Sequence, residues 1–244
     1  MTESTVTTQP APKSSFWEDV IDIFISPTAV FRRRQNSSVW PPMLFVALSI
    51  GIIFFATFNT LEPVFSAEFA RGMAKAAAKN PSAAQAPAET MNKIRDVSLN
   101  VTKYGLSVIM LITMFVIGCV SWLVGKMFDS KQTFQAALVV AAWSYMPRIL
   151  GALAGGIQGL LMDPANMTGA LSISLSPARF MDPETPNQLL YQMAGRLDLI
   201  TIWVTVLLAI GLAVTGKVPK GRAAVFGVVM WLLGSLQALR SALT

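Results

Sequence analysis

Apolar residues in this 244-residue chain fall into long blocks rather than into the short alternating runs of a soluble sheet. The first block, from about residue 40 to residue 60, contains no charged residue. Similar blocks follow at about 104–124, 133–153 with an extension to 162, 197–215 and 223–243. A helix needs about 20 apolar residues to cross the hydrocarbon core of a bilayer. The pattern therefore predicts an all-α membrane helix bundle over residues 40–244, with five transmembrane helices.

Two of these blocks need a further explanation. The first is followed by Glu62-Pro63, which is expected to end its helix. The third, from Thr133 to Met162, would form a straight helix about 45 Å long, well beyond a hydrocarbon core of about 30 Å. This block is therefore expected to tilt, to kink at Pro147 or to turn back near Gly155-Gly156.

Residues 1–39 are predicted to form a cytosolic segment that contains one amphipathic helix. Ser15 and Glu18 have the spacing of a capping box, and Pro27 follows the helix. Acidic residues share one face, and the other face carries Phe16, Trp17, Val20, Ile21, Phe24 and Ile25. The stretch is too short to span, and its pattern is typical of a helix that lies in the membrane interface. The alternative is a cytosolic helix packed on the protein's own loops.

The composition agrees with a membrane protein. Only 13% of the residues are charged and 53% are hydrophobic, whereas a soluble domain carries roughly 25% charged residues. The net charge is +6, but the basic residues flank the apolar blocks and do not form one polar face. Cations at such boundaries set topology and meet anionic lipids. Membrane lipids, and not nucleic acid, are therefore the partner expected for these cations.

The density of positive charge, rather than its total, indicates the orientation. With the N-terminus inside, the Lys and Arg residues divide evenly between the two sides. Two inner loops are nevertheless very short and basic, and they carry Lys126, Lys131, Lys217, Lys220 and Arg222. The N-terminus is therefore predicted to be cytosolic, and five spans would place the C-terminus on the outer side.

The residue types needed for most catalytic and metal sites are missing from the sequence. There is no histidine, and the single cysteine, Cys119, lies inside an apolar block. The usual zinc sites and every scheme that needs an imidazole are thereby excluded. No nucleophile elbow, zinc-protease motif or phosphate-binding loop is present. The sequence therefore predicts no enzyme, no catalytic residue, no metal site and no cofactor.

Arg148 is a basic residue deep inside a predicted span. A charge at this depth costs at least ~2.5 kcal/mol on insertion scales and needs a partner or a route to the interface. Asp198, at the outer beginning of the fourth span, is the natural candidate. We therefore predict a buried or half-buried Arg148–Asp198 pair. The alternative is that Arg148 reaches lipid phosphate while Asp198 caps a helix.

Several neighbours of Arg148 are predicted to serve kinking and packing. Pro147 removes a hydrogen bond and frees a backbone carbonyl near Trp143. Gly151 and Gly155 form a small-xxx-small face suited to close helix packing or dimerisation. Trp143 and Trp203 lie deep within predicted spans, where packing is the simplest role.

Three stretches of the chain resemble a known family. They are Asp19 to Pro27 (DVIDIFISP) followed by Phe31 and arginines, Ala142 to Pro147 (AWSYMP) with Tyr145, and Arg196 to Trp203 (RLDLITIW) followed by Gly211-Leu212. Together they resemble bacterial proteins of the Yip (Ypt-interacting protein) domain family over about residues 17–240. The resemblance implies a five-helix membrane domain with a cytosolic N-terminus, and it supplies no activity, cofactor or catalytic residue.

The resemblance also implies classes of function. Eukaryotic members act in vesicle traffic with small GTPases, usually through a longer N-terminus than this chain has. Bacterial members are often encoded beside ABC exporters, and some act as their accessory subunits. The first hypothesis is therefore a scaffold or accessory subunit in a bacterial inner membrane, with an ABC permease, its ATPase, an adaptor or further copies of itself as partners. The alternatives are a small lipid or solute carrier with a polar cleft at Pro147, Arg148 and Asp198, and a membrane-shaping or trafficking-type protein.

Overall fold

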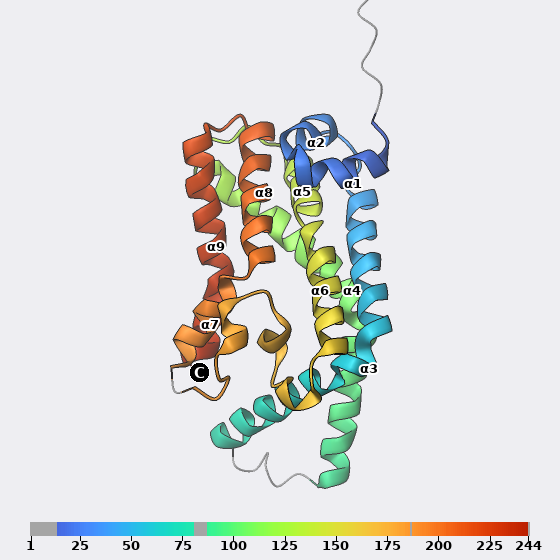
Figure 1. Cartoon of the computed structure of the whole chain (residues 1–244). Helices are drawn as coiled ribbons and strands as arrows, with labels where there is room; N and C mark the ends of the chain where they lie inside the picture. Colours follow the sequence, from blue (N-terminus) through green and yellow to red (C-terminus); the bar gives the residue numbers. More distant parts are fainter. Residues whose placement is uncertain (1–13, 81–86, 186, 244) are drawn as a thin grey trace, which may run out of the picture.

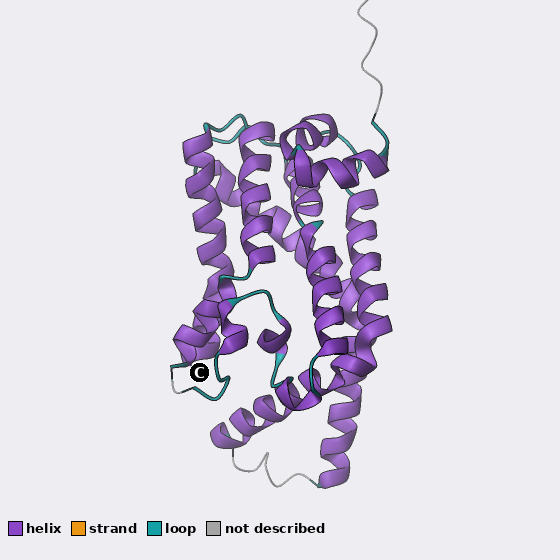
Figure 2. Ribbon diagram, viewed as in Figure 1, coloured by secondary structure: helices purple, strands orange, loops and turns teal. Residues whose placement is uncertain are grey.

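The structure is a bundle of α-helices and short 3-10 helices. This computed structural model describes residues 14–80, 87–185 and 187–243, and no strand occurs among them (Figure 2). The predicted all-α class is therefore confirmed, while residues 1–13 of the predicted cytosolic segment lie outside the described residues. The helices are α1 (Phe16–Ile25), α2 (Pro27–Arg34), α3 (Trp40–Lys79), α4 (Ala88–Lys126), α5 (Phe134–Ser144), α6 (Pro147–Leu161), α7 (Gln188–Arg196), α8 (Leu199–Thr215) and α9 (Lys220–Leu243).

The described helices include several that could cross a membrane. Three stretches, Trp40–Lys79, Glu89–Lys126 and Phe134–Leu161, are long and apolar enough. A fourth is added if α7 and α8, which meet at a bend of 56°, count as one span. These helices lie side by side in a bundle (Figure 1). The chain is therefore a helical membrane protein, and the number of five spans stays a prediction.

The first long helix does not end at Pro63 as the sequence predicted. Pro63 lies inside α3, which continues to Lys79, and its last part bends away beneath the bundle (Figure 1). A proline inside a helix removes one hydrogen bond, and the chain on either side can still remain helical. Beside the bend, Arg95 of α4 donates to Glu62 Oε1 at 2.7 Å and to Ser66 Oγ at 2.9 Å. These contacts join the extensions of α3 and α4.

The third apolar block is broken at Pro147, which was one of the three predicted outcomes. Helix α5 ends at Ser144, and Pro147 is the first residue of α6. The carbonyl of Trp143, near which the sequence predicted a free acceptor, accepts a hydrogen bond from Met146 N at 3.2 Å. The chain does not turn back at Gly155-Gly156, because α6 continues to Leu161. The kink therefore leaves the backbone at Trp143 satisfied.

Helix α5 forms the centre of the core. All its residues from Ala136 to Ser144 are buried, and glycines on neighbouring helices make room for it. A Cβ added at Gly118 of α4 would lie 3.1 Å from the Cα of Leu138, and one added at Gly211 of α8 would collide with Val140. Small residues at such crossings let helix backbones approach closely. The bundle is thus built around one buried helix.

Candidate functional site

Helices α1 and α2 form a cap over one end of the bundle (Figure 1). Ser15 begins α1 with the predicted capping box, because its hydroxyl accepts from Glu18 N at 3.2 Å while Ser15 N donates to Glu18 Oε2 at 2.8 Å. The amphipathic helix α1 ends at Ile25, just before Pro27 as predicted, and Pro27 is the first residue of a second helix, α2. The cap is therefore a pair of helices rather than the single predicted helix.

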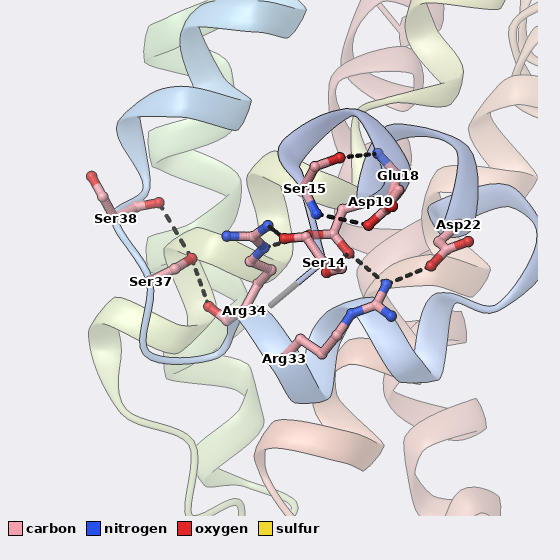
Figure 3. A network of polar contacts seen from close by, with 9 residues as sticks. All are labelled: Ser14, Ser15, Glu18, Asp19, Asp22, Arg33, Arg34, Ser37 and Ser38. Carbon is pink, nitrogen blue, oxygen red and sulfur yellow. Dashed lines mark hydrogen bonds and ion pairs between the residues drawn. The ribbon is translucent and has the colours of Figure 1, made fainter. Parts of the chain in front are cut away.

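A buried carboxylate joins the two helices of the cap (Figure 3). Asp19 is 0% exposed, and its two oxygens accept from Arg33 Nη2 and Arg34 Nε, both at 2.5 Å. Arg33 also binds Asp22 at 2.5 Å, and Arg34 donates to the carbonyl of Ser14 at 2.9 Å. The hydrogen bond to Asp22, with that to Asp19, raises the pKa of Arg33 above its ordinary value, against partial desolvation. We call Asp19, Asp22, Arg33 and Arg34 the Asp19 cluster.

Helix α1 has two apolar faces. One face packs on the bundle: the ring of Phe16 lies 5.5 Å from that of Trp143, and Phe24 lies 5.3 Å from Trp203. Val20 is half-buried on the same face. The other face exposes Trp17, Ile21 and Ile25, which repeat every four residues along one stripe. The alternative of packing on the protein itself thus holds for one face, and the exposed stripe is the part that remains available to a membrane interface.

A second polar cluster lines a cleft of about 410 Å³ between α6, α8 and the loop before α7, which we call the Arg148 cleft. Arg148 Nη2 donates to the hydroxyl of Thr201 at 3.3 Å, and this hydroxyl lies 3.3 Å from Asp198 Oδ1. Among the described residues, no ion pair within 4.0 Å joins Arg148 to Asp198. The predicted direct pair is therefore wrong, and Thr201 connects the two groups.

The reason is that Asp198 already has backbone partners. Oδ1 accepts from Thr201 N at 3.0 Å and so caps α8, while Oδ2 accepts from Leu175 N at 3.0 Å. Capping by an aspartate stabilises a helix start, and the second bond holds the loop against it. Asp198 thus has the capping role that the sequence gave as the alternative.

Arg196, which was not among the predicted site residues, also lines the Arg148 cleft. Its Nε donates to Ser235 Oγ at 3.1 Å and its Nη2 to the carbonyl of Trp231 at 3.4 Å. In return, Trp231 Nε1 donates to the carbonyl of Arg196 at 3.1 Å. The sequence signal was an arginine two residues before the cap of an apolar helix, at the start of the third stretch that resembles the family. The cleft therefore contains two guanidiniums and one carboxylate, an excess of positive charge.

The residues predicted for kinking and packing lie around this cleft. Trp143, Tyr145 and Pro147 are buried in the core, and Pro147 is not among the residues that line the cleft. A Cβ at Gly151 would lie 3.2 Å from Ile200 of α8, whereas one at Gly155 would meet only Ile173 of the loop, at 3.9 Å. The two predicted glycines thus face different elements of the same chain.

The closest packing of α6 involves two other glycines. A Cβ at Gly156 would lie 2.8 Å from Thr57, and one at Gly159 would collide with Leu61. Both contacts are with α3. The small face that joins α6 to α3 is therefore formed by Gly156 and Gly159 rather than by Gly151 and Gly155.

Comparisons with known proteins add one finding. The Yip1 domain, as a family model, matches residues 21–239. This range contains the Arg148 cleft, helix α2 and most of α9. No curated protein and no solved structure matches the chain.

Proposed function

The chain belongs to the Yip1 domain family, and on this premise we propose that it is a non-enzymatic membrane scaffold that binds other integral membrane proteins. Its apolar helices make it an integral membrane protein, and the family is not known as an enzyme family. We further propose that the protein lies in a bacterial inner membrane with its N-terminus in the cytosol. Its partner is then a transporter of the ABC exporter type.

The observation that carries this proposal is the exposed stripe of α1. Trp17, Ile21 and Ile25 are all more than half exposed, although the Trp17 ring also makes an edge-to-face contact with Phe45 of α3. The opposite face of the same helix is fixed to the bundle. The Asp19 cluster holds α1 to α2, so that the stripe is presented on a fixed support. Contiguous exposed apolar residues mark sites for membranes or protein partners. A fixed apolar stripe at the end of a membrane bundle suits a scaffold.

The test is purification of the tagged protein from its native membrane in mild detergent, with co-purifying proteins identified by mass spectrometry. We expect an ABC permease, its ATPase or its adaptor to be recovered with the native chain. The variant Ile21→Ser/Ile25→Ser should lose these proteins while it remains in the membrane fraction.

The matched control for this test is Leu160→Ser/Leu161→Ser. It makes the same chemical change at two exposed residues near the C-terminal end of α6. We expect it to retain the partners. Recovery of the native chain alone, or equal recovery from all three proteins, would overturn the proposal.

A second candidate function, a carrier of small anionic solutes or lipids, is favoured by the Arg148 cleft. Arg148 and Arg196 line it, while both oxygens of Asp198 are occupied by backbone N–H groups. If the protein is a carrier, native mass spectrometry of the purified chain should detect a bound small molecule. The variant Arg148→Gln should lose that molecule. A chain that carries the same molecules with and without Arg148 would exclude this function.

A further inference from the structure

A groove with a volume of about 1160 Å³ runs between α8 and α9 and reaches α2. We call it the α8–α9 groove. Apolar side chains form most of its walls, among them Ile202, Val206, Ile210, Val214, Val228 and Trp231. Only one end of the groove is strongly polar. This arrangement suits a ligand that is apolar along most of its length and charged at one end.

Three cations form that polar end. Arg32 comes from α2, and Lys217 and Lys220 come from the turn between α8 and α9. Among the described residues, none of the three forms an ion pair with a carboxylate. The nearby carboxylates have other partners, because Asp19 and Asp22 bind Arg33 and Arg34, and Asp129 binds Arg222 at 3.0 Å. The end of the groove is therefore positively charged and lacks a counter-charge from the chain.

The turn that carries the two lysines is held in place by the α4–α5 loop. The carbonyl of Gly216 accepts from Lys131 N at 3.0 Å, and Gln132 Nε2 donates to the hydroxyl of Thr215 at 2.6 Å. Lys217 itself has a φ of 55°, a left-handed conformation that a lysine rarely adopts. These contacts fix the backbone that positions the cations, and a binding site with a fixed backbone pays a smaller ordering cost.

The length of the groove matches one leaflet of a membrane. It reaches along α9 from Lys220 to Trp231, a rise of about 16 Å at 1.5 Å per residue. Half of a hydrocarbon core is about 15 Å thick. With the basic end at the level of the headgroups, Trp231 would lie near the middle of the bilayer.

We propose that the α8–α9 groove binds one anionic phospholipid from the leaflet on the side of the cap. Its phosphate is bound by Arg32, Lys217 and Lys220, and its acyl chains lie along the apolar walls. A transmembrane helix of a partner would fill the walls but would leave three cations without a counter-charge. A single phospholipid covers the apolar walls with its acyl chains and neutralises the cations with its phosphate. This charge complementarity favours a phospholipid as the occupant. The inference does not depend on the proposed scaffold function.

The test is native mass spectrometry of the full chain, titrated with phosphatidylglycerol or with phosphatidylcholine of the same acyl chains. We expect phosphatidylglycerol to bind the native chain more tightly than phosphatidylcholine. Each Lys or Arg near a membrane surface strengthens binding to anionic lipid about fivefold, so Arg32→Gln/Lys217→Gln/Lys220→Gln should weaken it about 100-fold. Inorganic phosphate should not displace the lipid, since it lacks acyl chains.

The matched control is Lys126→Gln/Lys131→Gln/Arg222→Gln. It removes the same net charge at three exposed residues at this end of the bundle that do not line the groove. We expect it to bind phosphatidylglycerol like the native chain. Equal weakening in both triple variants would mean attraction to the surface as a whole, and it would overturn the proposal. Unchanged binding in the groove variant would overturn it too.

A steric variant tests whether the acyl chains enter the groove. Ala224 is exposed and lines it, so Ala224→Phe should reduce phosphatidylglycerol binding at least tenfold while the three cations remain. Unfolding temperatures in detergent show whether each variant is folded. If Ala224→Phe keeps the lipid but loses a co-purifying membrane protein, the groove binds a partner helix and the proposal fails.

Discussion

Two groups of cations lie at the same end of the bundle, and they differ in what neutralises them. Arg33 and Arg34 share the buried carboxylate of Asp19, whereas Arg32, on the same helix, faces the α8–α9 groove with Lys217 and Lys220. Cations with a carboxylate partner in the chain fix one helix to another. Cations without such a partner are available to a ligand. The comparison therefore assigns architecture to the first group and binding to the second.

The cations of the Arg148 cleft are intermediate between these two groups in how they are neutralised. Its guanidiniums have partners, but the partners are neutral: Thr201 for Arg148, and Ser235 with the carbonyl of Trp231 for Arg196. Trp231 also lines the α8–α9 groove. Arg196 and Trp231 thus form a wall between the cleft and the groove, and a change at either residue is expected to affect both.

The largest effect is expected for Asp19→Ala, which removes the carboxylate that both guanidiniums share. A buried pair that loses one partner costs about 3–5 kcal/mol, and an exposed pair less than about 1 kcal/mol. Since the side chains of Arg33 and Arg34 are 36% and 26% exposed, we expect an intermediate loss of about 2 kcal/mol. Thermal unfolding in detergent should show Tm lowered by about 4–8 °C.

Asp22→Ala is the control for this prediction. Within the described part of the chain the carboxylate of Asp22 binds Arg33 alone, and both side chains are partly exposed. Its loss should therefore cost less than about 1 kcal/mol. Equal decreases in Tm for the two variants would mean that the buried Asp19 stabilises the cap no more than the partly exposed Asp22 does. The architectural role assigned to Arg33 and Arg34 would then be wrong.

An intermediate effect is expected in the Arg148 cleft. Asp198→Ala removes the cap of α8 and the acceptor of Leu175 N–H, and it should cost about 1–2 kcal/mol. Arg148→Gln keeps a donor for Thr201 and should cost less than about 1 kcal/mol. Because Thr201 separates the two residues, the double variant should show an interaction energy below about 1 kcal/mol. A larger interaction energy in the double-mutant cycle would indicate that Arg148 and Asp198 form a direct ion pair after all.

The smallest effects on stability are expected for Arg34 and Arg32, two arginines of α2. They compare a cation paired with Asp19 directly with a cation of the groove. Arg34→Gln removes a bond to Asp19 and should lower stability by about 1 kcal/mol, whereas Arg32→Gln should leave Tm in detergent unchanged. Added phosphatidylglycerol should raise the Tm of the native chain and of Arg34→Gln, because a ligand that binds only the folded state stabilises it. Arg32→Gln should gain less. The reverse pattern in the two variants would contradict the division of the cations.

Much of the architecture was predictable because it depends on local pattern. The apolar blocks predicted a helical membrane bundle, the spacing of Ser15 and Glu18 predicted the cap of α1, and Pro147 marked the break between α5 and α6. The end of α3 was not predictable in this way. Pro63 is tolerated inside the helix where Glu62 and Ser66 meet Arg95 of α4, and no pattern near Pro63 contains that contact.

The sites were less predictable, because a charge in the sequence does not reveal its partner. For Asp198 the sequence offered a pair with Arg148 or a helix cap, and the backbone N–H groups of Thr201 and Leu175 decide for the cap. Arg148 donates to the hydroxyl of Thr201, a partner that neither interpretation contained. The local sequence around Arg196 did not reveal its partners, since Trp231 and Ser235 lie on another helix. Sequence reasoning located the region of the cleft but not its hydrogen bonds.

The sequence by itself determined what each segment prefers as a solvent: apolar blocks for lipid, basic turns for the membrane boundary, and no residues for imidazole or zinc chemistry. Only the tertiary structure decided which of three consecutive arginines are neutralised. Arg33 and Arg34 face α1, and Arg32 faces a groove whose other cations stand far along the chain, at Lys217 and Lys220. The physical reason is that hydrophobicity is summed along a segment, whereas an electrostatic interaction depends on distances that exist only after the helices have packed.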